Sequence, residues 1–338
     1  MKVLGINGGN GVMLYPFKNR LICNIEPRAV FHTKENHQWE LNFKGIPLIK
    51  KAQLPDFKRV DVILSHPDCG HSSMLAFSRA KKMGKPKENI SVGLFFESLV
   101  KYKPKLFLME NLSKFIENYG EEGLKAALTL YNLVFHHISV SELGNSQKGR
   151  HRLLIIGVRK DLPKFISKVF LNLYRVNELK ASGMLIRGLN QPDPNLCHIR
   201  ESDKDIITLY AGYKDVIENI RKEWVTTRAL KKRWDTPDKK FSTAPGVYKN
   251  LEFELPATVR PSNRQYNHRG EMMSPRELAR IQGVPDQFKL YCDTKVPKYC
   301  INKGRVTVTK TPPMEVSVWF YMQTMKIKRY LCPSHARA

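Results

Sequence analysis

One cysteine in this sequence lies where covalent chemistry could take place. Cys69 is in the polar stretch SHPDCGHSS, which directly follows the mostly aliphatic residues 60–64. A short apolar run bounded in this way predicts a buried strand. In open α/β sheets, ligands bind beyond the carboxyl ends of the strands. Because the thiolate of cysteine is a strong nucleophile, Cys69 is a candidate for attack on a bound ligand.

Two further apolar runs adjoin residues that would complement this nucleophile. Residues 105–109 lead directly into Glu110, and Arg150 and Arg152 precede the apolar run LLIIGV. A carboxyl group can hold or deliver a proton, and guanidinium groups can hold a polar ring or an anion. Taken singly, Glu110 could be a helix-cap acid and the two arginines could be surface charges. Together with Cys69 they favour an active site.

A glycine-rich turn near the N-terminus predicts a cofactor site. An apolar run over residues 2–6 is followed by NGGNG and then VMLYPF, the order of strand, glycine turn and helix. Glycines allow close backbone approach to a nucleotide-type cofactor, and a helix amino end tolerates negative charge. A second strand, over residues 21–26, ends in Glu26, placed to bind ribose hydroxyls. The glycines could instead form only a tight turn, and Glu26 could be an N-terminal charge for a helix over PRAVFHTKEN.

The remaining segments predict a large α/β domain. Residues 90–104 and 123–135 are expected to be helical, and residues 39–59 to form loops. This alternation through residue 158 indicates a doubly wound, mostly parallel sheet. Later, SPRELARIQGVPDQF has a capping-box pattern, and MEVSVWFYMQTMKI predicts a helix that packs back onto the first domain. We expect domains over residues 1–163 and 164–255, with residues 256–338 returning to the first.

The charge of the chain favours a polyanionic partner. It has 57 Lys and Arg against 31 Asp and Glu, a net charge of +26. Such an excess attracts nucleic acid through steering and counterion release. The basic residues gather in the middle of the chain beside Trp224 and Trp234, although this stretch could also be a solvated helix face over a local core. The predicted phosphate contacts are Arg221, Lys222, Arg228, Lys231, Lys232, Arg233, Lys239 and Lys240.

The cysteines suit a reducing compartment. Six are present without a CxxC pair, and the sequence contains neither a signal-peptide pattern nor a run of transmembrane length. We therefore expect a soluble, intracellular monomer with no membrane association. His66, Cys69 and His71 could ligate zinc, but no partner pair lies nearby, so no metal is expected. Cys69 could also be a plain buried cysteine.

In order and approximate spacing, these motifs resemble those of the DNA cytosine-C5 methyltransferases. NGGNG resembles the cofactor glycine motif, HPDCGHSS the proline-proline-cysteine-glutamine motif and MENL the glutamate-asparagine-valine motif. KGRHR resembles the glutamine-any-arginine-any-arginine motif, and SPRELARIQGVPDQF is close to another family motif. The resemblance covers roughly residues 1–160 and 255–325. It does not cover the basic middle, where the family keeps its target-recognition domain.

The resemblance implies a Rossmann-like enzyme that uses S-adenosylmethionine and double-stranded DNA in the cytoplasm of a prokaryotic or virus-infected cell. Cys69 would add to C6 of a flipped-out cytosine, and Glu110 would support protonation at N3. Arg150 and Arg152 would hold the base. The enamine so formed would accept a methyl group at C5, after which a base removes the C5 proton and the thiolate leaves. The implied cofactor-binding residues are Ile6, Gly8, Gly9, Gly11, Glu26, Asn42 and Pro67.

The sequence departs from the family pattern at several positions. Asp68 replaces the proline before the nucleophile, and a carboxylate there should raise the pKa of the thiol. Lys148 stands where glutamine is expected, and VTKTPPMEV occupies the region of the family's glycine-asparagine pair. These departures leave two other hypotheses open. The same fold and nucleophile could act on RNA or another pyrimidine or use a modified donor, or the chain could be a non-catalytic DNA-binding relative.

Overall fold

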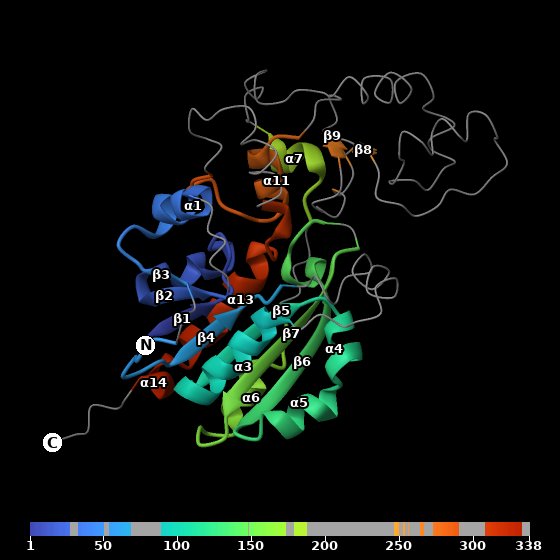
Figure 1. Cartoon of the computed structure of the whole chain (residues 1–338). Helices are drawn as coiled ribbons and strands as arrows, with labels where there is room; N and C mark the ends of the chain where they lie inside the picture. The colour runs from blue at the N-terminus through green and yellow to red at the C-terminus, as the bar shows by residue number, and fades with distance from the viewer. Residues whose placement is uncertain are drawn as a thin grey trace, which may run out of the picture. The chain divides into compact units, whose positions relative to one another are not determined.

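The computed structural model describes most of the α/β part of the chain and little of the basic middle. The described residues are 1–27, 33–50, 54–68, 89–147, 149–173, 179–187, 247–249, 253, 256, 264–266, 273–290 and 308–332. Cys69 and all eight predicted phosphate contacts between residues 221 and 240 lie outside them. Figure 1 gives the labels of the elements.

The chain divides into two compact units. The first comprises Met1–Gly144, Arg150–Asn177 and Thr311–Ala338, and the second comprises Asn145–Gly149 and Glu178–Lys310. These limits differ from the expected domain boundaries after residues 163 and 255. The expected boundaries separate segments by their role in catalysis or DNA recognition, and they stay predictions.

A seven-stranded sheet forms the centre of the first unit. Its order is β3-β2-β1-β4-β5-β7-β6, with β3 to β5 parallel and β7 antiparallel to both of its neighbours. This arrangement confirms the predicted mostly parallel, doubly wound sheet. The strands are β1 (Val3–Ile6), β2 (Leu21–Glu26), β3 (Leu48–Lys50), β4 (Val62–Ser65), β5 (Leu106–Asn111), β6 (Tyr131–Ser139) and β7 (His151–Arg159).

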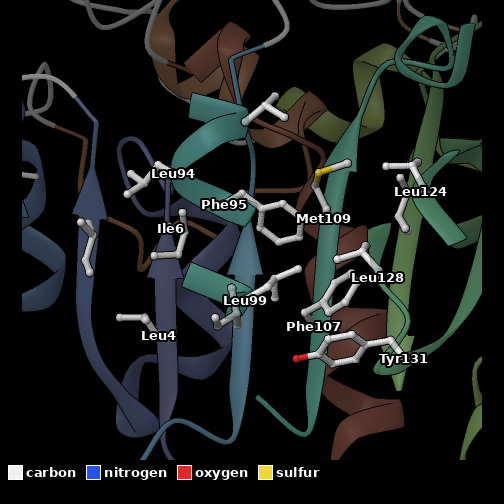
Figure 2. Packing of buried hydrophobic residues seen from close by; sticks show 14 of the residues in the cluster. Leu4, Ile6, Leu94, Phe95, Leu99, Phe107, Met109, Leu124, Leu128 and Tyr131 are labelled. Atoms are coloured by element: carbon white, nitrogen blue, oxygen red, sulfur yellow. The ribbon is translucent and has the colours of Figure 1, made fainter. Parts of the chain in front are cut away.

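Helices cover both faces of this sheet. On one face α3 (Ile90–Tyr102) places Phe95 and Leu99 in a core with Ile6 and Phe107 (Figure 2). On the other face α13 (Met314–Lys326) packs against η1 (Val12–Arg20), as predicted for the C-terminal helix. The other helices of this unit are α1 (Thr33–Phe43), α4 (Lys114–Tyr119), α5 (Glu121–Ala127), η3 (Val140–Leu143), α6 (Phe165–Val169) and α14 (Lys328–Leu331).

Two sequence expectations about secondary structure are wrong. The helix expected over residues 123–135 ends at Ala127, and β6 begins at Tyr131. Its Leu and Ala residues favour a helix, but pairing of all nine β6 residues with β7 provides the backbone hydrogen bonds instead. Residues 39–59 are also not entirely loops, because α1 extends to Phe43 and Leu48–Lys50 pairs with β2 as an edge strand.

In the second unit, the structure describes α7 (Ser182–Ile186), α11 (Pro275–Ile281) and a parallel pair, β8 (Val247–Lys249) with β9 (Arg264–Tyr266). The predicted capping box begins α11. The Ser274 side chain accepts a hydrogen bond from the Glu277 amide, and the Ser274 amide donates to the Glu277 carboxylate. Within the described ranges, no helix is both long and apolar enough to cross a membrane.

Candidate active site

Strand register brings the ends of three strands to one edge of the sheet. Ile6 at the end of β1 pairs with Ser65 of β4, and Ser65 pairs with Met109 of β5. The next residue after each of these positions is polar: Asn7, His66 and Glu110. The order of the strands reverses between β1 and β4, which is where doubly wound sheets bind ligands. Parallel pairing thus brings three polar residues together at the place where such sheets bind ligands.

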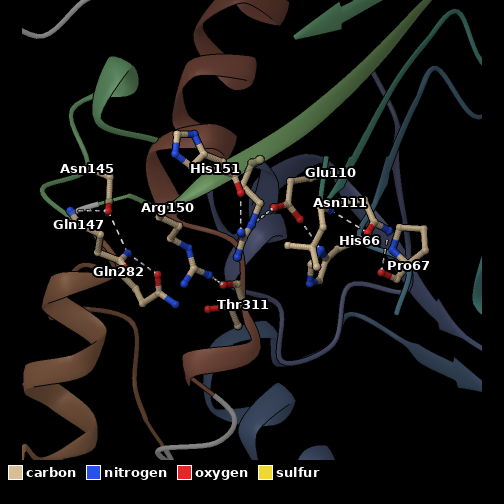
Figure 3. Close-up of polar contacts among 12 residues, drawn as sticks. His66, Pro67, Glu110, Asn111, Asn145, Gln147, Arg150, His151, Gln282 and Thr311 are labelled. Carbon is tan, nitrogen blue, oxygen red and sulfur yellow. Dashed lines mark hydrogen bonds and ion pairs between the residues drawn. The ribbon is translucent and has the colours of Figure 1, made fainter. Parts of the chain in front are cut away.

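Glu110 is the centre of a buried charge cluster. Its side chain is fully buried, with 0% exposed surface. One carboxylate oxygen, Oε1, lies 2.7 Å from Nε of Arg152, and the other forms an ion pair with Nδ1 of His66 (Figure 3). Glu110 pairs across the sheet with Leu154, so Arg152 is its diagonal neighbour on β7. The antiparallel register therefore explains why this arginine reaches the carboxylate.

The protonation state of Glu110 is set by these neighbours. Burial by itself raises the pKa of the carboxyl group, but the positive charges of His66, Arg152 and Arg150 outweigh it. The net effect is a pKa below the ordinary value for glutamic acid. Glu110 is consequently a carboxylate at neutral pH, and a proton that it passes to a ligand must first come from another group.

Arg150 lies just before β7 and is almost completely buried, with 2% exposed surface. Its Nη2 donates a hydrogen bond of 2.9 Å to the carbonyl of Thr311. The structure thus brings Arg150, Arg152 and Glu110 into one cluster, as the motif order predicts. Their assignment as catalytic residues stays a prediction.

The segment that leads to Cys69 is fixed by backbone contacts. The His66 amide donates to the carbonyl of Ile6, and the Asn111 side chain donates to the carbonyl of Pro67 at 3.3 Å. Asn89, which also caps the start of α3, donates to the carbonyl of Asp68 at 3.0 Å. The Asp68 side chain is exposed. Cys69 is the next residue, so the described contacts hold the chain immediately before it.

The glycine turn is tied to the end of β2. The Gly8 amide donates to Oδ1 of Asn24, and the Gly9 amide donates to Oε1 of Glu26 at 2.7 Å. Gly9 has φ +56°, and a Cβ added there would meet no atom within 4 Å. A Cβ on Gly11, where φ is +87°, would instead lie 2.2 Å from the ring of Phe43. Close packing thus requires glycine at 11, whereas Gly9 leaves open space beside the backbone.

Two asparagine side chains in this turn have polar atoms that could bind a cofactor. Asn7 Nδ2 donates to the carbonyl of Ser91, and Asn10 Oδ1 accepts from the amide of Val12. Their other ends, Asn7 Oδ1 and Asn10 Nδ2, are buried and have no hydrogen-bond partner among the described residues. The turn therefore holds one oriented acceptor and one oriented donor. Neither side chain was predicted from the sequence as a binding residue.

The other predicted cofactor residues have varied surroundings. The Ile6 side chain is buried in the hydrophobic core. Asn42 is buried on α1 and donates to the carbonyl of Gln38. Pro67 is buried and contributes its carbonyl to Asn111. Their contacts with a cofactor stay predictions.

Comparison with known proteins decides the family. The model of the C-5 cytosine-specific DNA methylase family matches residues 6–302, which is most of the chain. The chain belongs to this family. It is therefore a methyltransferase of the class that acts on DNA, and the family resemblance of the motifs is confirmed.

Two relatives of this methylase are a bacterial and a phage enzyme. It is 24% identical over 320 residues to the type II methyltransferase M.FnuDI of Fusobacterium nucleatum, covering 86% of both chains. The orphan methyltransferase M.SPRI of Bacillus phage SPR is 30% identical over 132 residues, 37% of this chain and 28% of that protein.

Solved structures share the fold of the methylase. The S. pombe Dnmt2 methyltransferase has a TM-score of 0.62 at 15% identity, covering 97% of this chain and 98% of that one. A putative DNA modification methyltransferase encoded within an E. coli prophage has a TM-score of 0.64 at 16% identity, covering 97% and 99%. At these identities the likeness concerns the fold alone.

Gln147, which directly precedes Lys148, has a structural role in the second unit of the methylase. Gln147 is buried, and its Nε2 donates to Oε1 of Gln282 at 2.7 Å and to Oδ1 of Asn145 at 2.9 Å. Figure 3 shows Asn145, Gln147 and Gln282 together, and Asn145 in turn donates to the carbonyl of Ile281 at the end of α11. Gln147 and Asn145 therefore link their loop to residues 281–282. The sequence alone does not reveal this contact, because the two motifs are far apart in the chain and become neighbours only in the fold.

Proposed function

We propose that this methylase transfers a methyl group from S-adenosylmethionine to C5 of cytosine in double-stranded DNA, through a covalent bond between Cys69 and C6 of a flipped-out base. The observation that carries the proposal is the fully buried Glu110 carboxylate, paired with Arg152 and His66 beside the segment that leads to Cys69. We also propose that the enzyme acts as a monomer in the cytoplasm.

The chain's own residues have separable roles in this mechanism. The Cys69 thiolate donates an electron pair to C6, and Glu110, once protonated, passes a proton to N3, so that C5 becomes nucleophilic. Arg152 holds the Glu110 carboxylate in place, and Arg150 adds positive charge beside it. When bound, S-adenosylmethionine supplies the electrophilic methyl group that C5 takes up. Loss of the C5 proton to a base then lets the C6–S bond break, and N3 returns its proton.

The glycine turn fits the donor. The amino-acid end of S-adenosylmethionine carries an ammonium group, which needs an acceptor, and a carboxylate, which needs a donor. Asn7 Oδ1 and Asn10 Nδ2 are such a pair, and Gly9 leaves its backbone accessible. We propose that these asparagines bind that end of the donor, in place of the glycine-asparagine pair that is not evident near the C-terminus.

Replacing Asn10 by alanine is expected to weaken binding of S-adenosylmethionine about 10-fold, because a hydrogen bond to a charged group is lost. Isothermal titration calorimetry of the protein with the donor alone, without DNA, measures this directly. Asn19→Ala, which changes an asparagine of η1 outside the turn, is the matched control. Equal donor affinity in the Asn10 variant and the wild type would refute the assignment.

Mass spectrometry of nucleosides tests the proposed reaction. Double-stranded DNA incubated with the enzyme and S-adenosylmethionine is expected to yield 5-methylcytosine, and the product mass identifies the base and the transferred group together. RNA of the same sequence is the control substrate. Methylation of RNA alone, or a mass increment other than that of a methyl group, would contradict the proposal.

A further inference from the structure

We infer that His66 is a positioning residue that holds the proton which Glu110 passes to N3 of the target base. This inference rests on the proposed function and adds to it a proton source within the chain. It starts from the ion pair between Nδ1 of His66 and Oε2 of Glu110.

Among the residues that the structure describes, two groups contact the Glu110 carboxylate, and one of them can release a proton. Arg152 contacts Oε1, but a guanidinium stays protonated under all conditions in which proteins fold. The imidazole of His66 contacts Oε2, and imidazole gains and loses a proton near neutral pH. The two partners therefore have different roles, because Arg152 fixes the carboxylate and His66 can protonate it.

The side chains of His66 and Glu110 also differ in their exposure to solvent. The Glu110 side chain has no exposed surface, whereas 19% of the His66 side chain is exposed. A proton from solvent thus reaches the imidazole more readily than the carboxylate. His66 can therefore take up its proton from water before the reaction begins, and it connects the buried acid with solvent.

The positions of both groups are set by the sheet. His66 is one residue beyond the paired end of β4, and Glu110 is one residue beyond the position on β5 that pairs with Ser65. The His66 amide is bonded to Ile6, and the next carbonyl, that of Pro67, accepts from Asn111. Since Asn111 directly follows Glu110, the backbone holds the imidazole segment against the segment that bears the acid.

The charges around Glu110 favour transfer of a proton from His66 to Glu110 over a Glu110 side chain that is always protonated. Within the described part of the chain, the charged groups that face Glu110 are His66, Arg152 and Arg150. With three cationic groups around one carboxylate, protonation of Glu110 by itself is unfavourable. Moving the proton from His66 to Glu110 removes one positive and one negative charge together, so a buried charge pair becomes a neutral pair.

The proton is conserved through the cycle. As the sulfur electron pair forms the C6–S bond, N3 takes the proton from Glu110, and Glu110 takes one from His66, which becomes neutral. After the methyl group is added and the C5 proton is lost to a base, the C6–S bond breaks and N3 gives its proton back to Glu110. The proton then returns to His66.

The test compares pH–rate profiles for a single turnover at saturating S-adenosylmethionine and DNA. In His66→Asn, an amide can still donate a hydrogen bond to Glu110 but carries no transferable proton. Glu110 must then take its proton from solvent, and carboxylic acids ionise at lower pH than imidazole. We expect the alkaline limb of the profile to move at least about one pH unit lower, with a rate loss of roughly 10-fold or more at pH 8. Donor and DNA affinities should stay within about two-fold.

The control is His137→Asn, because His137 on β6 faces Glu121 at 3.8 Å in an exposed pair of the same chemical kind. His66→Gln serves as a second variant if His66→Asn does not fold. A uniform rate loss with an unshifted alkaline limb would mean a merely structural role and would overturn the inference. So would a wild-type rate that stays constant up to about pH 9, beyond the range in which imidazole titrates. Absence of 5-methylcytosine from the wild-type reaction would refute the proposed function itself.

Discussion

The Cys69→Ala protein is expected to form no covalent adduct with a DNA duplex that carries 5-fluorocytosine, and to lose methyltransfer by at least about 10⁴-fold. A base cannot remove fluorine from C5 as it removes the C5 proton. The C6–S bond of the wild-type enzyme therefore stays intact once the methyl group is added. Without the thiol, no such bond forms and C5 is not activated. Denaturing electrophoresis and mass spectrometry of the protein–DNA adduct measure the outcome.

Two cysteines within the described residues, Cys23 and Cys332, provide matched controls. Cys23 is buried in β2, and burial raises the pKa of its thiol to about 12, so it remains protonated and unreactive. Cys332 is partly buried at the end of α14, where its sulfur accepts a hydrogen bond from the N-terminal ammonium group. Cys23→Ala and Cys332→Ser should both keep the adduct. An adduct that persists in Cys69→Ala and disappears in either control would assign the nucleophile elsewhere.

Most of the sheet could be predicted because most of its strands can be recognised from their own residues and the residues next to them. The runs at β1, β2, β4 and β5 are apolar and are bounded by polar residues or glycine, so both their length and their ends are visible in the sequence. β6 is different. Its nine residues follow a helix-favouring segment, and only pairing with β7, which is later in the chain, makes them a strand. Long-range hydrogen bonding of this kind leaves little trace in a local pattern.

The same distinction holds at the site. Glu110, Arg150 and Arg152 could be proposed because each adjoins an apolar run and matches a family motif. The sequence suggests His66 only as a zinc ligand, and it gives no sign of the contact with Glu110. The missing information was register: Ser65 pairs with Met109, which places the two following residues side by side. The sequence does not reveal Asn7 and Asn10 for a similar reason, because an amide atom without a hydrogen-bond partner among the described residues can be recognised only when its neighbours are placed.

Replacing Glu110 by glutamine is expected to lower the methyltransfer rate about 10²- to 10⁴-fold, since the amide cannot pass a proton to N3. It should also lower the stability of the fold at neutral pH by about 3 kcal/mol, because Arg152 and His66 would lose their buried counter-charge. Single-turnover kinetics and denaturant unfolding measure the two effects separately.

The stability effect has a predicted pH dependence. The pKa of Glu110 in the folded protein is below its ordinary value, so its charged form stabilises the fold above the pKa of the unfolded chain. That contribution disappears as the pH falls through the folded-state pKa, where the wild-type carboxyl also becomes neutral. The difference between wild type and Glu110→Gln should therefore be largest near pH 7 and shrink in acid. Glu122→Gln, which changes an exposed carboxylate 2.7 Å from Lys125, should have little effect at any pH. A difference that grows in acid would mean that Glu110 is already protonated at neutral pH, and no relay from His66 would then be needed.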